Sequence, residues 1–141
     1  MRKEIIRVKL KEIRESLEKV RTHLSQTFEE FLDLGLIKDG IYKKVEFMIE
    51  NVLDICKIIN SDLNLGLPRK DVDVIENLVR HGIISKEMGE KIKGMKGFRN
   101  ILVYGYGEID EDIAYDEIKN GLKDFEEFEK EIEKFLEKSE S

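Results

Sequence analysis

Hydrophobic residues recur every three or four positions along most of this chain, which is the spacing of amphipathic α-helices. The first run predicts one long helix, and Gly35 predicts where that helix ends. The run approximates a heptad seam, which predicts either core packing within one subunit or a stripe shared with a second subunit. The stripe consists of Ile6, Leu10, Ile13, Leu17, Val20, Leu24, Phe28 and Phe31.

Further runs of the same kind predict four more helices. Their expected N-caps are Asp39, Asp71 or Asp73, Ser85 and Asp110. Their expected ends are Asn60 and Ser61, His81 and Gly82, Gly105, and a tail from Lys138 to Ser141. Segment 62–70 lacks a helical period and holds the chain's one proline, which predicts a loop. Short connections favour antiparallel neighbours, so we expect an all-α, up-and-down bundle of about five helices in one domain, 1–141.

Composition supports this fold and narrows the function. The 141 residues are 40% charged and 40% hydrophobic, with no tryptophan, a balance typical of long solvated helices. The net charge of -6 argues against an extended nucleic-acid surface but allows a local basic site. No stretch reaches the roughly 18 apolar residues of a membrane span, so we expect a cytoplasmic protein with no membrane partner.

The sequence predicts neither a metal nor a cofactor. The two histidines, His23 and His81, are far apart, and no Cys-x-x-Cys or His-x-x-x-His spacing occurs. We expect His81 to be a surface imidazole stabilised by the helix dipole or to contact the end of its own helix. Cys56 lies in an apolar helical stretch and is expected in the core. The glycines of segment 94–107 fit neither a Walker nor a Rossmann phosphate loop.

Segment 91–106, KIKGMKGFRNILVYGY, carries three lysines and an arginine without an acidic residue. It can be a solvated lysine face or a site for an anion. Arg99 suits a phosphate because its fork donates two parallel hydrogen bonds. On a regular helix Arg99 and Tyr106 share a face and Tyr104 points about 140° away, so convergence requires a helix end or a second subunit. Alternatively, Arg99 pairs with an acidic neighbour and the tyrosines pack.

The segment GFRNILVYGYGEID, preceded by HGIISKEMGEKIKGM, resembles the signature of the HepT toxins of the HEPN superfamily. That signature is Arg-Asn, three mostly apolar residues, His, one residue, Tyr, and soon afterwards Asp. Arg99, Asn100, Tyr106 and Asp110 match it, and the resemblance extends over most of the chain.

The resemblance implies a helical homodimer in which the arginine and histidine of both subunits meet in a cleft and cleave RNA without a metal. It also implies a partner, a MntA-type minimal nucleotidyltransferase, which acts as antitoxin by adenylylating the motif tyrosine. By position, that tyrosine is Tyr106.

The chain departs from the signature at Tyr104, which occupies the histidine position. Histidine can accept or donate a proton near neutrality, whereas a tyrosine with a pKa of about 10 is a poor base at pH 7. We therefore expect a strongly weakened nuclease, with Arg99, Asn100 and Tyr104 as its catalytic residues, or none. The alternatives are a catalytically silent module that binds RNA, a nucleotide or a nucleotidyltransferase partner, and a homodimerisation module without a ligand.

Overall fold

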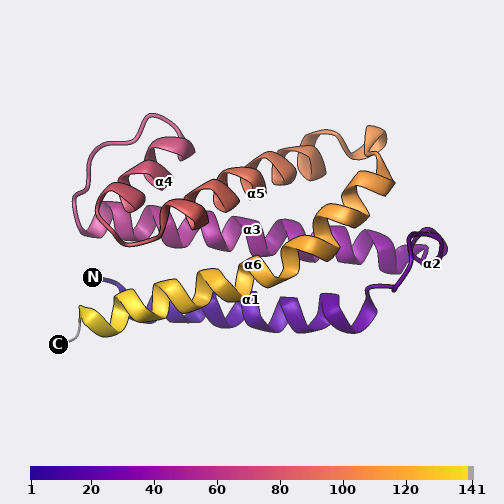
Figure 1. The fold of residues 1–141 in the computed structure, drawn as a ribbon, viewed down its shortest axis with the longest axis horizontal. Helices are drawn as coiled ribbons and strands as arrows, with labels where there is room; N and C mark the ends of the chain where they lie inside the picture. The colour runs from indigo at the N-terminus through magenta and orange to yellow at the C-terminus, as the bar shows by residue number, and fades with distance from the viewer. Residues whose placement is uncertain (140–141) are drawn as a thin grey trace.

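The computed structural model describes residues 1–139, except for the side chain of Tyr106, and this part of the chain contains helices and no strand. The helices are α1 (Lys3–His23), α2 (Phe28–Leu32), α3 (Leu36–Asp62), α4 (Asp71–Arg80), α5 (Lys86–Tyr104), the short 3-10 helix η1 (Tyr106–Glu108) and α6 (Glu111–Lys138) (Figure 1). The expected all-α fold is confirmed, and the short helix α2 is added to the five expected helices.

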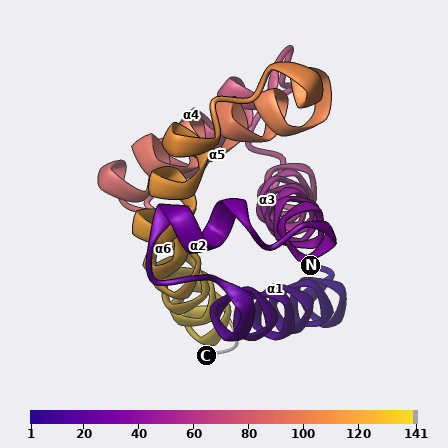
Figure 2. The same ribbon diagram turned by 90° about the vertical axis from the view of Figure 1, so that its right-hand side faces the viewer.

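The long helices α1, α3, α5 and α6 run in alternating directions, so that both ends of the chain lie at one end of the bundle (Figures 1 and 2). Helix α1 packs along both α3 and α6. Three arginines spaced seven residues apart on α1 pair with glutamates on α6 in antiparallel order. The pairs are Arg7–Glu133 at 3.9 Å, Arg14–Glu129 at 3.2 Å, and Arg21–Glu126.

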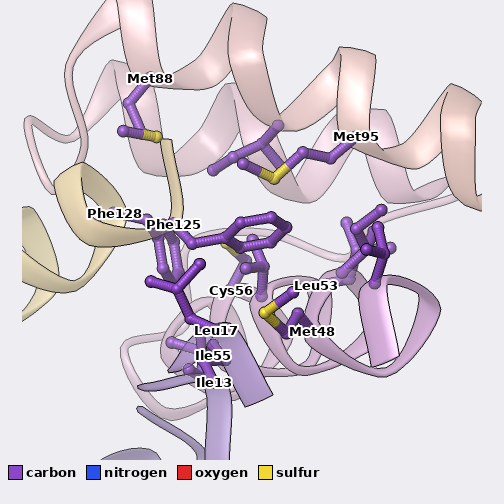
Figure 3. Close-up of a cluster of buried hydrophobic side chains, with 14 of the residues drawn as sticks. Ile13, Leu17, Met48, Leu53, Ile55, Cys56, Met88, Met95, Phe125 and Phe128 are labelled. Atoms are coloured by element: carbon purple, nitrogen blue, oxygen red, sulfur yellow. The ribbon is translucent and has the colours of Figure 1, made fainter. Parts of the chain in front are cut away.

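The core lies where α1, α3, α5 and α6 meet (Figure 3). It includes Ile13, Leu17, Met48, Ile55, Cys56, Met88 and Phe128. The first five members of the α1 stripe, Ile6 to Val20, are buried within this chain, so that face is used for core packing rather than for a second subunit. Cys56 is in the core, as expected.

The first expected helix is wrong beyond His23. The chain becomes extended at Leu24, and α2 begins after Thr27, whose hydroxyl caps it by accepting the Glu30 N–H.

Side chains of α6 stabilise this break between α1 and α2 through two hydrogen bonds. The Tyr115 hydroxyl donates to the Ser25 carbonyl at 2.6 Å, and the Lys119 ammonium donates to the Gln26 carbonyl. The break therefore lets Phe31 turn inward and pack on Tyr115, with their ring centroids 5.1 Å apart.

The expected N-cap at Asp39 is also wrong, because α3 begins at Leu36 and Gly35 precedes it with a φ of 60°. That left-handed conformation suits glycine and turns the chain out of α2. The loop after α3, the N-caps Ser85 and Asp110, and the end of α5 at Gly105 are confirmed. The expectation for the tail falls partly on residues 140–141, which lie outside the described part of the chain.

Candidate functional site

Arg99 lies in the last part of α5. Helices α4 and α5 both pack against α3 (Figure 1). The Arg99 side chain is 20% exposed and faces two carboxylates. Nη1 lies 3.9 Å from Glu50 Oε1 on α3, and Nη2 lies 3.6 Å from Asp71 Oδ2 at the start of α4. The guanidinium is therefore held between three helices by charge.

Asp71 also faces a second cation. Its Oδ1 lies 3.3 Å from the ammonium of Lys57, which is two turns along α3 from Glu50. Glu50, Arg99, Asp71 and Lys57 thus form a row of alternating charge across α3, α4 and α5. Sequence reasoning did not identify Glu50 or Lys57 and considered Asp71 only as a cap. The available signal was the seven-residue spacing of Glu50 and Lys57, which places them on one face of α3.

The first turn of α4 is placed by a local hydrogen-bond network. The Asp73 carboxylate accepts the backbone N–H groups of Arg69 and Lys70 at 2.9 and 3.1 Å. These N–H groups hold the pKa of the Asp73 carboxyl below its usual value. Behind the loop, buried Asn60 accepts from the Asn77 amide at 3.0 Å and donates to the Gly66 carbonyl at 2.9 Å. The loop is thereby tied down and presents Asp71 to Arg99.

Tyr104 does not join Arg99. It is the last residue of α5, and its side chain is 82% exposed. Because α5 stays helical through Tyr104, the two side chains leave the helix about 140° apart. Asn100 is half-buried and follows Arg99 in the last part of α5. For segment 91–106, the alternative interpretation is thus correct for Arg99, which pairs with acidic residues, and wrong for Tyr104, which does not pack.

The other two motif residues follow the end of α5. Tyr106 is the first residue of η1, and its side chain lies outside the part of the structure that is described. Asp110 is the N-cap of α6, where its Oδ1 accepts from the N–H groups of Asp112 and Ile113 at 3.1 and 3.3 Å. Asp110 therefore has a structural role in starting α6.

An apolar cleft of about 590 Å³ opens between the end of α5 and the start of α6. Ile101 and Ile113, which line it, are 51% and 60% exposed. Gly97, on the same wall, has open space where a side chain would be. The surface between the end of α5 and the start of α6 is therefore hollow and largely apolar, while the region around Arg99 is charged.

The lysines of the positive segment are largely neutralised. Lys91 pairs with Glu127 and Asp124 of α6 at 2.5 and 3.3 Å, and its hydrogen bond with Glu127 raises the lysine pKa. Lys93 pairs with Glu76 and Glu90 at 3.6 Å. The segment is thus a salt-bridged face with one converging charged site, at Arg99, rather than a continuous basic surface.

Neither histidine lies at this site. His81 caps the end of α4 away from Asp71, with Nδ1 2.9 Å from the Asn77 carbonyl, as expected. His23 makes the same contact with the Lys19 carbonyl at the end of α1. Among the described residues no group of His, Cys, Asp and Glu side chains could hold a metal ion, and no helix is long and apolar enough to span a membrane.

This chain is similar to known proteins over most of its length. The family described as ribonuclease HepT-like matches residues 13–132. An mRNA nuclease HepT from Shewanella oneidensis is 30% identical over 92 residues, which cover 65% of this chain and 69% of that protein.

Several solved structures share the fold of this chain. The tri-AMPylated HEPN toxin of Shewanella oneidensis, in complex with MNT antitoxin, has a TM-score of 0.82 at 26% identity and is matched over 92% of this chain and 96% of that one. A toxin–antitoxin complex with AMP-PNP has a TM-score of 0.83 at 25% identity, over 92% and 98% of the two chains. The cytosolic protein YutE of Bacillus subtilis, of unknown function, shares the fold with a TM-score of 0.84 at 19% identity, over 99% and 93%.

Proposed function

This chain belongs to the ribonuclease HepT-like family, and from that premise we propose that it is a metal-independent endoribonuclease toxin that a nucleotidyltransferase antitoxin neutralises. The observation that carries the proposal is the position of Arg99. A largely buried guanidinium, fixed by three helices at the family's arginine position, is suited to holding the phosphate of an RNA backbone.

In the proposed reaction the 2′-hydroxyl of RNA attacks the adjacent phosphorus and the bond to the 5′-oxygen of the next nucleotide breaks. Arg99 stabilises the negative charge that develops on the phosphorane, and the Asn100 amide orients the phosphate. Tyr104 donates a proton to the leaving 5′-oxygen. Because a tyrosine is only about one part in a thousand ionised at pH 7, it is a poor proton acceptor, and the proton of the 2′-hydroxyl passes to solvent water instead. The loss of histidine as proton acceptor is worth about 10²–10⁴-fold in rate, so cleavage is slow.

We propose that the working unit is a homodimer. Arg99 and Tyr104 point in different directions on one helix, so they act on one phosphate when a second copy supplies one of them. The exposed Ile101 and Ile113, which line the cleft between α5 and α6, offer an apolar surface for that copy. Mixing Arg99→Ala with Tyr104→Ala subunits tests this arrangement. Mixed dimers should recover part of the parental cleavage rate, while each variant alone should not.

The proposed partner is a MntA-like nucleotidyltransferase that transfers AMP to Tyr106. The related toxin of Shewanella oneidensis is tri-AMPylated in its complex with MNT antitoxin, which supports this assignment. Co-expression followed by peptide mass spectrometry should find adenylate mass on Tyr106. Mass on Tyr104 alone, or no added mass, would show that the assignment is wrong.

The nuclease is tested with labelled single-stranded RNA in EDTA, comparing the parent protein with Arg99→Ala and Tyr104→His. Lys86→Ala, a change at an exposed lysine at the start of the same helix, is the matched control. Slow parental cleavage that Arg99→Ala abolishes, that Tyr104→His accelerates and that the control leaves unchanged supports the proposal. Parental cleavage that persists in Arg99→Ala refutes the assigned site.

A second candidate is a catalytically silent relative that binds RNA, a nucleotide or the antitoxin. Two observations favour it, namely Tyr104 at the histidine position and the two carboxylates that already neutralise Arg99. An inert parent together with an active Tyr104→His variant in the same assay would establish this candidate.

A further inference from the structure

Lys57 and Arg99 converge on a single carboxylate. Lys57 Nζ lies 3.3 Å from Asp71 Oδ1, and Arg99 Nη2 lies 3.6 Å from Asp71 Oδ2. The two cations belong to α3 and α5, and the carboxylate belongs to α4. Two cations from different helices therefore pair with the two oxygens of one anionic group. This is the arrangement of a small anion-binding site.

Arg99 has unused hydrogen-bonding capacity at this place. Its Nε is buried and has no hydrogen-bond partner in the described part of the chain. Its contacts with Glu50 and Asp71, at 3.9 and 3.6 Å, are longer than the roughly 3.2 Å of an N–H···O hydrogen bond. Buried donors in native proteins are nearly always bonded. The carboxylates thus balance the charge of Arg99 without satisfying its donors.

We propose that Lys57 and Arg99 together bind a backbone phosphate of RNA, and that the Asp71 carboxylate occupies this position in the free protein. The inference rests on the proposed function and adds to it a second phosphate-binding residue, Lys57, and a competitor, Asp71. A phosphate presents several charged oxygens to the two cations and can accept the hydrogen bonds that Arg99 leaves unmade. RNA binding then requires the Asp71 side chain to turn away from both cations.

The chain contains matched control residues. Asp54 and Lys57 both lie on α3, and Asp54 pairs with Lys9 of α1 at 3.5 Å rather than with Arg99. Asp54→Asn therefore removes the same charge as Asp71→Asn without removing a group that pairs with Lys57 or Arg99. Lys9→Ala is the corresponding control for Lys57→Ala. All four positions are partly exposed in the structure.

The experiment measures binding of a fluorescein-labelled 2′-O-methyl RNA, which cannot be cleaved through its own 2′-hydroxyl, by anisotropy at several salt concentrations. Asp71→Asn should tighten binding about fivefold, the effect of removing one unit charge about 4 Å from a phosphate in water, and more than Asp54→Asn does. Lys57→Ala should reduce the slope of log K against log salt by about 0.7, which corresponds to one lost contact with a single strand. Lys9→Ala should leave the slope unchanged.

A double variant links the three residues. If the site is real, Asp71→Asn should give little or no gain in a Lys57→Ala background, since one cation of the pair is then missing. Equal binding by Asp71→Asn and Asp54→Asn, or an unchanged slope in Lys57→Ala, would overturn the proposal. Competition by AMP as effective as by RNA would assign the site to a free nucleotide phosphate instead of the RNA backbone, and so would also overturn it.

This test separates the site from the nuclease. The expected binding pattern in a protein that cleaves no RNA would reject the proposed ribonuclease and keep the phosphate site. Cleavage that needs Arg99, together with binding that is indifferent to Lys57 and Asp71, would do the reverse. Thermal unfolding of each variant shows whether a loss of binding reflects a loss of fold.

Discussion

The Arg99 guanidinium and the Asp71 carboxylate face each other across the contact between α4 and α5, with Nη2 3.6 Å from Oδ2. A different nitrogen of the same side chain, Nη1, faces Glu50 on α3. One planar fork therefore spans two helices. A lysine, with one nitrogen, cannot reproduce this geometry.

We accordingly expect Arg99→Lys to lose most of any RNA cleavage even though the charge is kept. The loss should be about tenfold or more, because a hydrogen bond to a charged group contributes about 1.5–3 kcal/mol. Single-turnover cleavage of labelled RNA measures it, with the urea unfolding midpoint as the control for stability. Parental rates in Arg99→Lys would show that charge alone is required.

Gly89→Ala should destabilise the protein. A Cβ at Gly89 would lie 2.6 Å from Val79 Cγ2, where α4 packs closely on α5. Overpacking of this kind costs about 1–3 kcal/mol, which outweighs the roughly 1 kcal/mol gained by replacing glycine with alanine in a helix. Gly40→Ala in α3, where nothing lies within 4 Å, is the control and should be neutral or stabilising. Equal unfolding free energies for the two variants would contradict the packing argument.

Cys56 should be unreactive in the folded protein. Its burial raises the pKa of the thiol to about 12, so the reactive thiolate is nearly absent at about pH 8. A water-soluble thiol reagent should label it only when guanidinium chloride unfolds the chain. Rapid labelling in buffer would show that the α3 core opens under native conditions.

Acid should weaken the cap of α4. The backbone N–H groups of Arg69 and Lys70 lower the pKa of the Asp73 carboxyl in the folded protein. The unfolded carboxyl, with a pKa of about 3.9, takes up its proton first as the pH falls. The stabilisation by ionised Asp73 is therefore fully present above about pH 4 and is lost as the pH falls through the lower folded value.

The measurement is the urea unfolding midpoint between about pH 5 and pH 3, in the parent and in Asp73→Asn. The midpoint should fall less in the variant, which has no carboxyl to protonate at this position. The carboxyls of Asp62 and Glu127, whose pKa values Arg2 and Lys91 lower, remain in both proteins and cancel in the comparison. Identical pH dependence in the two proteins would show that Asp73 does not contribute to it.

The pattern of apolar and capping residues predicted a helix boundary correctly where that boundary depends on residues of the same helix. The caps at Ser85 and Asp110 and the end of α5 at Gly105 follow from side-chain chemistry within one turn of helix. Pattern failed between His23 and Leu36, because Phe28 and Phe31 keep the helical spacing while bonds from α6 to the carbonyls of Ser25 and Gln26 stabilise a break. Those bonds join residues that are distant in sequence, so the periodicity of apolar residues could not predict them.

The sequence by itself determined that this is an all-α member of a ribonuclease family, with Arg99, Asn100 and Tyr106 at motif positions and Tyr104 in place of histidine, since these are properties of residue order. Only the tertiary structure decided what Arg99 faces. Glu50 and Asp71 reach it from two other helices, and Lys57 reaches Asp71, so which charges meet depends on how α3, α4 and α5 pack. Helical period specifies the buried face of each helix but not the partner opposite a charged residue at its edge.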